Sequence, residues 1–320
     1  MIKLTTDLRE TAIAIAQEAG QAIMQVYADG FEVQIKDDDS PVTAADLAAN
    51  QVIELGLRQL TPDLPILSEE SAQVPWEHRR HWGAYWLVDP LDGTREFVKR
   101  NGEFSVNIAL IYQGAPAFGV VLAPVTGIVW HAMRGELAYR RQGLHDTVLR
   151  TRTPATAPLR VAASRSHRSP ETEALLARMG RIETIAQGSS LKFCRIAEGG
   201  LDVYPRLGPT SEWDTAAGQC VLHAAGGAVL SVGTGKPLRL TQQPGSRQRP
   251  GFRQPSRQQP GFRQPSGFQQ PSALQQRRWC QLRSQLLQPA SSKRRWRGRE
   301  RRRAQRSSSW CIPLWTQAGQ

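Results

Sequence analysis

Trp86-Leu87-Val88-Asp89-Pro90-Leu91-Asp92-Gly93-Thr94 is the stretch of sequence that decides the fold. An apolar run typical of a buried strand ends in two carboxylates, which are followed directly by Gly-Thr. Pro90 fixes its own φ angle and Gly93 permits a sharp reversal, so both carboxylates and the Leu91 carbonyl can turn toward one point. An oxygen cluster of this kind suits a hard divalent cation such as Mg²⁺. Taken alone, the pattern favours the structural explanation, an Asp-Gly loop that caps a helix.

The charge of the chain is divided unevenly between its two parts. The full sequence has 320 residues and a net charge of +13, which by itself favours a nucleic-acid-binding protein. Residues 241–320 contain 17 Lys and Arg against one acid, Glu300, so this segment carries +16 and residues 1–240 carry −3. The first 240 residues therefore have the composition of an ordinary, slightly acidic globular protein.

The C-terminal segment has a repetitive composition. Gly-Phe-Arg-Gln-Pro-Ser occurs at 251–256 and 261–266 and imperfectly at 267–272, and no helical or strand period follows. Because such a segment buries too little apolar surface to offset its ordering entropy, we expect 241–320 to be a disordered basic tail. Repeat expansion or an altered reading frame is the origin that we favour. The alternative is that the tail is an electrostatic tether to nucleic acid or to anionic lipid. Of these two partners, we do not expect nucleic acid.

The first 240 residues indicate a cytoplasmic protein. Their two cysteines, Cys194 and Cys220, have neither disulfide-framework nor metal-ligand spacing, which suits a reducing compartment. The sequence has no signal peptide and no apolar run of 18 residues. Because of the basic tail, peripheral association with the cytoplasmic face of the inner membrane is an alternative location.

Alternating patterns predict an α/β fold. Helical spacing extends over 6–27, where Thr6 or Asp7 is the expected N-cap, and over 43–60; buried strands are expected at 66–68 and 85–88. An antiparallel meander follows, and beyond a Thr/Pro-rich boundary at 151–158 strands and helices alternate. The meander strands are 104–111, 117–122 and 128–133, the later strands are 159–163, 201–204 and 228–231, and the later helices are 170–179, 190–197 and 214–225. We expect an N-terminal metal-binding subdomain at 1–156, a C-terminal α/β subdomain at 157–240, and the tail.

Three further acidic positions fit around the opening motif. Asp46 lies at a helix start, Glu69 and Glu70 follow a strand, and Asp214 lies at the start of a later helix. Each has a structural explanation, since acidic residues cap helices and solvate strand ends. Their occurrence together with the opening motif favours a shared site.

The motifs as a group resemble the inositol monophosphatase superfamily. Pro41–Asp46, Leu67–Glu70, Trp86–Thr94 and Glu103–Asn107 carry this resemblance, which spans roughly residues 7–240. Gly188–Phe193 and Tyr204–Asp214 are similar to the bacterial 3′(2′),5′-bisphosphate nucleotidases, which remove the 3′-phosphate of 3′-phosphoadenosine 5′-phosphate during sulfate assimilation. The resemblance implies an αβαβα sandwich of two subdomains, two or more Mg²⁺ ions and inhibition by Li⁺.

The resemblance also implies roles for individual residues. Glu69, Asp89 and the Leu91 carbonyl are expected to hold one Mg²⁺, and Asp89, Asp92 and Asp214 another. Thr94 is expected to hydrogen-bond the attacking water, with Asp46 behind it and Glu69 assisting. The expected substrate contacts, which would bind the phosphate or the rest of the nucleotide, are Gly93, Thr94, Ser190, Lys192, Arg206 and Asp214. Two metals of this kind suit phosphate-ester hydrolysis, because they activate water and neutralise the phosphate.

Two other functions remain open at this point. An inositol-1-phosphate or fructose-1,6-bisphosphate phosphatase would use the same metal site, whereas Lys192 and Arg206 favour a substrate with a second phosphate. The structural alternative for these two residues is a pair of solvated surface charges. An RNA-binding protein that keeps the fold as a scaffold is the non-enzyme alternative. The histidines, including His81 and His223, lack ligand spacing and are expected to be structural.

Overall fold

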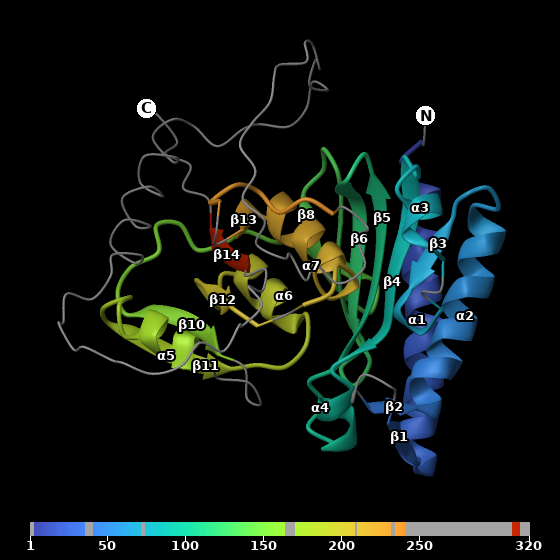
Figure 1. Ribbon diagram of the computed structural model, residues 1–320, viewed down its shortest axis with the longest axis horizontal. Helices are drawn as coiled ribbons and strands as arrows, with labels where there is room; N and C mark the ends of the chain where they lie inside the picture. The colour runs from blue at the N-terminus through green and yellow to red at the C-terminus, as the bar shows by residue number, and fades with distance from the viewer. Residues whose placement is uncertain are drawn as a thin grey trace, which may run out of the picture.

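The fold is a stack of alternating helical and sheet layers. The computed structural model describes residues 3–35, 41–71, 74–163, 170–208, 210–231, 234–240 and 309–313. Helices α1 (Thr6–Asp29) and α2 (Ala44–Leu60) cover one face of a seven-stranded sheet, and α6 (Leu191–Ala197) and α7 (Trp213–Ala224) cover the other (Figure 1). Smaller sheets and α5 (Pro170–Leu176) lie beyond α6. This order of layers confirms the predicted αβαβα sandwich.

The two N-terminal helices have defined ends. Helix α1 begins after its N-cap Thr5, whose hydroxyl accepts the N–H of Leu8 at 3.1 Å, so the predicted N-cap at Thr6 or Asp7 is one or two residues late. Gly30 ends this helix with a φ of +91°, a value that favours glycine. Helix α2 begins after Thr43 with a capping box that includes Asp46. Its end at Leu60 is the predicted one.

The large sheet has the strand order β3-β4-β5-β6-β7-β8-β9. Strands β3 and β4 are parallel and all later neighbours are antiparallel, which confirms the predicted meander and extends it by two polar strands. The bounds are β3 Ile66–Ser68, β4 Ala84–Asp92, β5 Ser105–Tyr112, β6 Ala115–Ala123, β7 Ile128–Met133, β8 Ala138–Gln142 and β9 His145–Val148. Short elements complete this half: β1 Val33–Ile35, β2 Pro41–Thr43, the 3₁₀ turn η1 Glu69–Ser71, α3 Trp76–Arg79 and α4 Thr94–Val98.

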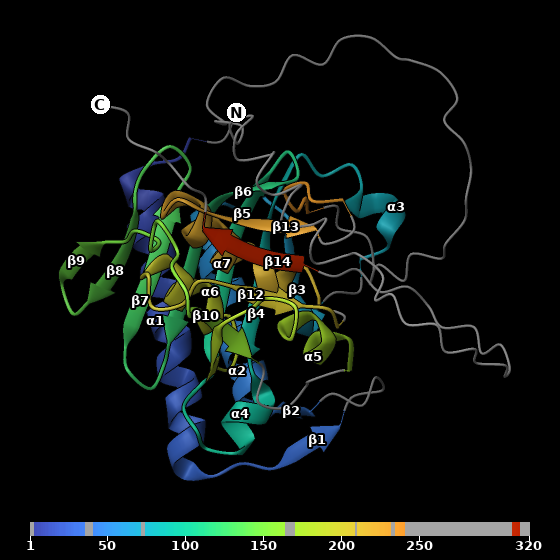
Figure 2. The ribbon, with the colours of Figure 1, turned by 90° about the vertical axis from the view of Figure 1, so that its left-hand side faces the viewer.

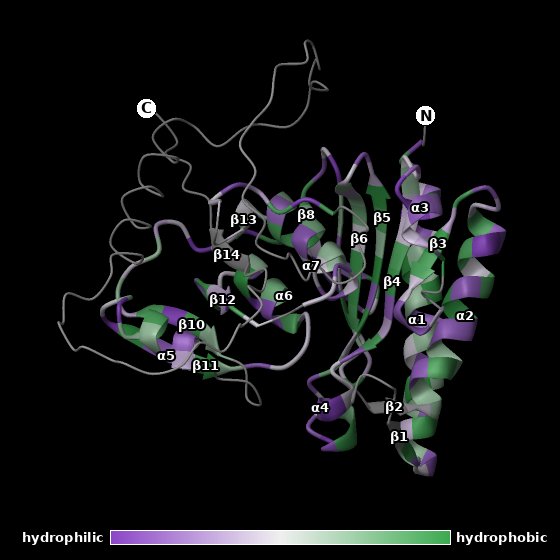
Figure 3. Cartoon of the chain, in the orientation of Figure 1, coloured by the Kyte–Doolittle hydropathy of each residue, from purple (hydrophilic) through white to green (hydrophobic). Residues whose placement is uncertain are grey.

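Strand β4 contributes to both hydrophobic cores. Trp86 and Val88 pack with α1 and α2, whereas Tyr85 and Leu87 belong to the core under α6 and α7. Side chains alternate along a strand, so Asp89 continues the set that faces α7. Apolar side chains accordingly line both faces of the sheet. The hydropathy colouring shows hydrophobic, green segments along its central strands (Figure 3).

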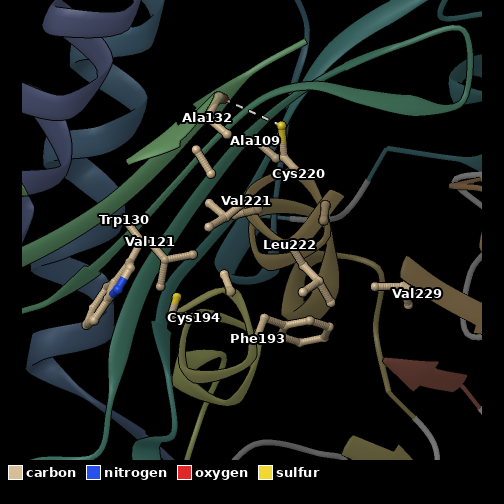
Figure 4. Close-up of a cluster of buried hydrophobic side chains, with 14 of the residues drawn as sticks. Ala109, Val121, Trp130, Ala132, Phe193, Cys194, Cys220, Val221, Leu222 and Val229 are labelled. Carbon is tan, nitrogen blue, oxygen red and sulfur yellow. Dashed lines mark hydrogen bonds between the residues drawn. The ribbon is translucent and has the colours of Figure 1, made fainter. Parts of the chain in front are cut away.

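Helix α7 lies close against the sheet. A Cβ atom added to Gly119 of β6 would lie 2.7 Å from the carbonyl oxygen of Ala217, so only glycine allows this approach. Cys220 and Val221 of α7 and Cys194 of α6 fill the core beside β6 and β7, and the Cys220 thiol donates to the Ala132 carbonyl at 3.5 Å (Figure 4). This packing places the N-terminus of α7 at the end of β4.

The C-terminal subdomain contains two small sheets. Strands β10 (Leu159–Ala163) and β11 (Ile182–Ala186) are parallel and connected through α5. Strands β12 (Tyr204–Arg206) and β13 (Gly227–Ser231) belong to the second sheet. The predicted strand at 201–204 therefore begins later, at Tyr204, and β11 was not predicted.

A strand from the basic tail completes this second sheet. β14 (Ser309–Pro313) lies between β12 and β13 and is antiparallel to both (Figure 2). The structure thus differs at these five residues from the expectation that the tail is disordered throughout. The alternative last strand at 250–253 lies outside the described residues. Within the described ranges, no helix combines the length and the apolar character that crossing a bilayer requires.

Two histidines predict a loss of stability in acid. Burial lowers the pKa of His131 and lowers that of His223 to about 4, whereas an unfolded histidine titrates near 6.5. The unfolded chain therefore takes up these protons first. Their contribution to the free energy of unfolding is constant above about pH 7 and falls as the pH drops through 6.5, by about 1.4 kcal/mol per pH unit and proton.

Urea denaturation between pH 4.5 and pH 8 measures this contribution. The double variant His131→Gln/His223→Gln should lose less stability in acid than the unmodified chain. Buried carboxylates with raised pKa values have the opposite pH dependence, but they are common to both proteins and cancel in the difference. Parallel stability curves for the two proteins would contradict the prediction.

Candidate metal and phosphate site

Three carboxylates from separate elements meet at the end of β4. Glu69 follows β3, Asp89 lies in β4 and Asp214 begins α7, and one oxygen of each lies within 4.8 Å of the others. Parallel pairing brings the ends of β3 and β4 side by side, and the close packing of α7 adds the third group. A donor set made only of carboxylate oxygens fits a hard divalent cation. The structure thus brings together three of the metal ligands that the sequence analysis named.

Asp89 lies in an environment that disfavours its charge. Its side chain is 1% exposed, and burial raises its pKa well above the usual range. The carboxylates of Glu69, Asp92 and Asp214 raise it further by charge repulsion. Burial also raises the pKa of Asp214 to about 6, with Asp92 as the next cause. Like charges this close require a compensating cation to ionise together, which is the second indication of a metal site.

A β-bulge separates Asp89 from Asp92. Asp89 pairs with Asn107 of β5, whereas Asp92 pairs with Ser105, so β4 has one residue more than its partner here. The predicted end of the strand at Val88 is therefore wrong, because pairing continues past Pro90 with this irregularity. The bulge redirects Asp92, whose oxygen Oδ2 accepts the N–H and the hydroxyl of Ser190 at 2.5 and 2.6 Å.

Asp46 and Thr94 form a pair beside the carboxylate cluster. Asp46 Oδ2 accepts the N–H and hydroxyl of Thr43 at 2.8 and 2.7 Å, which fixes the carboxylate within its capping box. Its other oxygen accepts the hydroxyl of Thr94 at 3.2 Å. The Thr94 hydroxyl also lies 3.4 Å from the carbonyl oxygen of Leu91. Burial is the main cause that raises the pKa of Asp46, whose side chain is 2% exposed.

A cavity opens next to this cluster and contains the cationic candidates. Its wall includes Gly93, Lys192, Arg206 and Asp214. Lys192 is 7% exposed, which excludes the solvated surface charge considered above. Its Nζ atom lies 5.0 Å above the Tyr204 ring and 3.4 Å from the Gln187 carbonyl oxygen. Burial lowers the pKa of Lys192 to about 8, and the charge of Asp92 opposes this shift.

Ser190 lies deeper than the other predicted substrate contacts. Its side chain is 1% exposed, and its hydroxyl lies between Asp92 and the backbone carbonyl of Asp214. Gly93, by contrast, begins α4 with a φ of +95° at the cavity wall, next to Thr94. The turn at Gly93 is therefore one that only glycine adopts without strain.

Asn107 belongs to the Glu103–Asn107 motif, but no role for it follows from the sequence alone. Its amide Nδ2 donates to the Ser190 hydroxyl at 2.9 Å and lies 3.4 Å from Asp92 Oδ2. The available signal in the sequence is an amide residue within the largely apolar run of β5, where its side chain is 1% exposed. Glu103 is a second such case, since its carboxylate accepts the N–H of Gly188 at 2.8 Å.

Comparison with known proteins accounts for this arrangement. The model of the inositol monophosphatase family matches residues 5–250. The chain belongs to the inositol monophosphatase family. Members of this family are metal-dependent, which agrees with the carboxylate cluster of Glu69, Asp89 and Asp214.

Similar family members include several proteins named as nucleotidases. The 3′(2′),5′-bisphosphate nucleotidase CysQ of Salmonella typhimurium is 52% identical over 247 residues, which cover 76% of this chain and 98% of that protein. The protein of the same name from Escherichia coli K12 is 52% identical over 243 residues, covering 75% of this chain and 96% of that protein. The crystal structure of CysQ from Bacteroides thetaiotaomicron is 40% identical with a TM-score of 0.65, and the match covers 72% of this chain and 91% of that one.

Proposed function

We propose that this inositol monophosphatase family member hydrolyses the 3′-phosphate of 3′-phosphoadenosine 5′-phosphate to give AMP and phosphate, with Mg²⁺ as its cofactor. One observation carries the proposal: the carboxylate cluster of Glu69, Asp89 and Asp214 adjoins a cavity whose wall contains Lys192 and Arg206. The nucleotidases named above, which are 52% identical, support the same substrate class.

The carboxylates would hold the metal ions. Glu69, Asp89 and the Leu91 carbonyl form one proposed ligand set, and Asp89, Asp92 and Asp214 form the other. When bound, Mg²⁺ supplies electrostatic stabilisation of the phosphate and lowers the pKa of a bound water. The reaction needs this help, because phosphate monoesters are among the slowest compounds to hydrolyse without a catalyst.

Thr94 and Asp46 would orient the nucleophile. The Thr94 hydroxyl donates its proton to Asp46, so its oxygen lone pairs point away from that carboxylate and can accept a hydrogen bond from water. Thr43 holds Asp46 through two hydrogen bonds and thereby fixes this direction. Glu69, which belongs to the carboxylate cluster, would assist in removing the water proton. Gly93 and Thr94 would present backbone N–H groups to the phosphate being transferred.

Lys192 and Arg206 would bind the phosphate that is not hydrolysed. Lys192 is largely buried and its ammonium group lies over the Tyr204 ring, so contact with a phosphate requires little further loss of hydration from this group. A cation in such surroundings forms a strong charge-assisted contact. Inositol 1-phosphate lacks the second phosphate and would gain nothing from this pair of residues.

A phosphate-release panel tests the assignment. We expect Mg²⁺-dependent release from 3′-phosphoadenosine 5′-phosphate with a kcat/KM well above that for inositol 1-phosphate and fructose 1,6-bisphosphate. Addition of EDTA should abolish release and excess Mg²⁺ should restore it. Preferential hydrolysis of inositol 1-phosphate would contradict the nucleotide assignment but leave the metal site in place.

Replacing Lys192 by methionine should separate the substrates. Methionine keeps most of the packing against Tyr204 and removes the charge, which for a charged hydrogen bond costs about 1.5–3 kcal/mol, or roughly 10- to 150-fold in kcat/KM. We expect this loss for 3′-phosphoadenosine 5′-phosphate and a much smaller one for inositol 1-phosphate. The exposed Lys236→Met variant is the control. Equal losses on both substrates would show that Lys192 supports the fold or a shared phosphate.

A further inference from the structure

One oxygen of Asp92 receives several hydrogen bonds at the end of β4. The backbone N–H of Ser190 donates to Oδ2 at 2.5 Å, the Ser190 hydroxyl lies 2.6 Å from the same atom, and Asn107 Nδ2 lies 3.4 Å from it. Within the part of the chain that the structure describes, every hydrogen bond of this carboxylate ends on Oδ2. The arrangement fixes the rotation of the carboxylate and leaves Oδ1 for another ligand.

The Ser190 hydroxyl connects two of the proposed metal-ligand segments. Its oxygen lies 2.6 Å from Asp92 Oδ2 and 2.7 Å from the backbone carbonyl oxygen of Asp214. A hydroxyl has only one proton, so it donates to one of these acceptors at a time, and the carboxylate is the stronger acceptor. Asn107 Nδ2 donates to the hydroxyl oxygen at 2.9 Å and thereby orients it.

These contacts leave Ser190 little capacity to bind a nucleotide. The side chain is 1% exposed, its proton is taken by Asp92 or Asp214, and its oxygen already accepts from Asn107. Its backbone N–H is also used by Asp92. The geometry therefore favours a role toward the carboxylates over the substrate contact that the sequence suggested.

We propose that Ser190, oriented by Asn107, is a positioning residue that holds Asp92 in the rotamer required for metal binding. The proposal rests on the metal site of the proposed function and adds to it the groups that orient one ligand. Partners of this kind fix the direction of a ligand oxygen, and their loss typically lowers metal affinity about 10- to 100-fold. Because Ser190 precedes α6 directly, the same turn also sets the position of Lys192.

Titration calorimetry with Mg²⁺ alone tests the proposal on the full chain without substrate. Ser190→Ala removes the hydroxyl and keeps the backbone N–H contact to Asp92. We expect the Mg²⁺ dissociation constant to rise about tenfold. The matched control is Ser105→Ala, which deletes a hydroxyl that is also fully buried, on the residue paired with Asp92. The Ser105 hydroxyl has no hydrogen-bond partner among the described residues, so this variant should bind Mg²⁺ as the unmodified chain does.

Asn107→Ala provides a second variant should Ser190→Ala be poorly folded. Both variants act on the same carboxylate, so we expect Asn107→Ala to weaken Mg²⁺ binding as well. In the double variant the loss should be smaller than the product of the two single losses, because the groups share one network.

Kinetics at saturating Mg²⁺ separates positioning from substrate contact. We expect Ser190→Ala to need more Mg²⁺ for half-maximal activity, with a KM for 3′-phosphoadenosine 5′-phosphate within about twofold of the unmodified value. A raised KM with unchanged Mg²⁺ affinity would overturn the proposal in favour of a substrate contact. Equal Mg²⁺ affinity of Ser190→Ala and Ser105→Ala would overturn it as well. An unmodified chain that binds no Mg²⁺ would instead contradict the proposed function.

Discussion

Replacing Asp89 by asparagine is expected to lower kcat by about a thousandfold or more, because the proposed metal ligand sets share this carboxylate. Loss of a catalytic electrostatic contact of several kcal/mol corresponds to a change of this size. Asparagine has the same shape, so the packing of β4 should be preserved. Phosphate release from 3′-phosphoadenosine 5′-phosphate in saturating Mg²⁺ measures the effect, and Asp7→Asn at an exposed position of α1 is the control.

The same variant should be more stable than the unmodified chain when metal is absent. Burial and the neighbouring carboxylates raise the pKa of Asp89, so the folded state gains from neutralisation of this group. In Mg²⁺ the order should reverse, since a ligand that binds only the folded state raises the melting temperature of the unmodified chain alone. Turnover close to that of the unmodified chain would show that the metal assignment is wrong. A melting temperature below that of the Asp7→Asn control would contradict the argument from charge repulsion.

Deletion of residues 309–320 is expected to lower the melting temperature by about 10 °C or more. Three residues of β14 pair with β12 and five with β13, so its loss leaves both strands without their shared neighbour. At about 0.5–1.5 kcal/mol net per backbone hydrogen bond, this amounts to several kcal/mol, and each corresponds to about 2–4 °C in a protein of this size. The shorter deletion of 314–320, which keeps β14, is the control.

The two deletions should also differ in substrate binding. Strand β12 contains Tyr204 and Arg206 of the cavity wall, so we expect the longer deletion to raise the KM for 3′-phosphoadenosine 5′-phosphate. Mg²⁺ affinity should change little, because Asp89 belongs to the large sheet, Glu69 follows β3 of that sheet and Asp214 belongs to α7. Equal melting temperatures and KM values for the two deletions would show that β14 neither stabilises the fold nor positions the cavity-wall residues of β12.

Those parts of the fold that depend on local patterns could be predicted from the sequence. The apolar runs of β4 to β7 and the helical spacing of α1 and α2 are visible because their buried residues recur with the period of the element. Strand β9 could not be predicted, because its four residues are all exposed and only one of them, Val148, is apolar. The continuation of β4 past Pro90 was missed because a proline inside a strand argues against pairing, and only the bulge permits it here.

In the candidate site, too, residues with a local motif could be predicted and contacts between distant segments could not. The acidic residues were found because each belongs to a recognisable motif, and three of them converge in space. The relation between Ser190 and Asp92 could not be predicted, since the two residues are 98 positions apart and meet only after α6 packs against the end of β4. Likewise, nothing local in Lys192 distinguishes a buried ammonium group from a surface charge.

The position of β14 has a consequence for the order in which the chain folds during its synthesis. Tyr204 and its partner Cys311 are 107 positions apart, whereas every pair within the meander is close in sequence. The large sheet with α1 and α2 ends at Val148, so this layer can assemble while the ribosome is still translating the rest. The second sheet closes only after residue 313 has emerged. Until then β12 and β13 have open edges that can pair with another nascent chain, which makes a pause in translation before residue 309 a specific risk for aggregation.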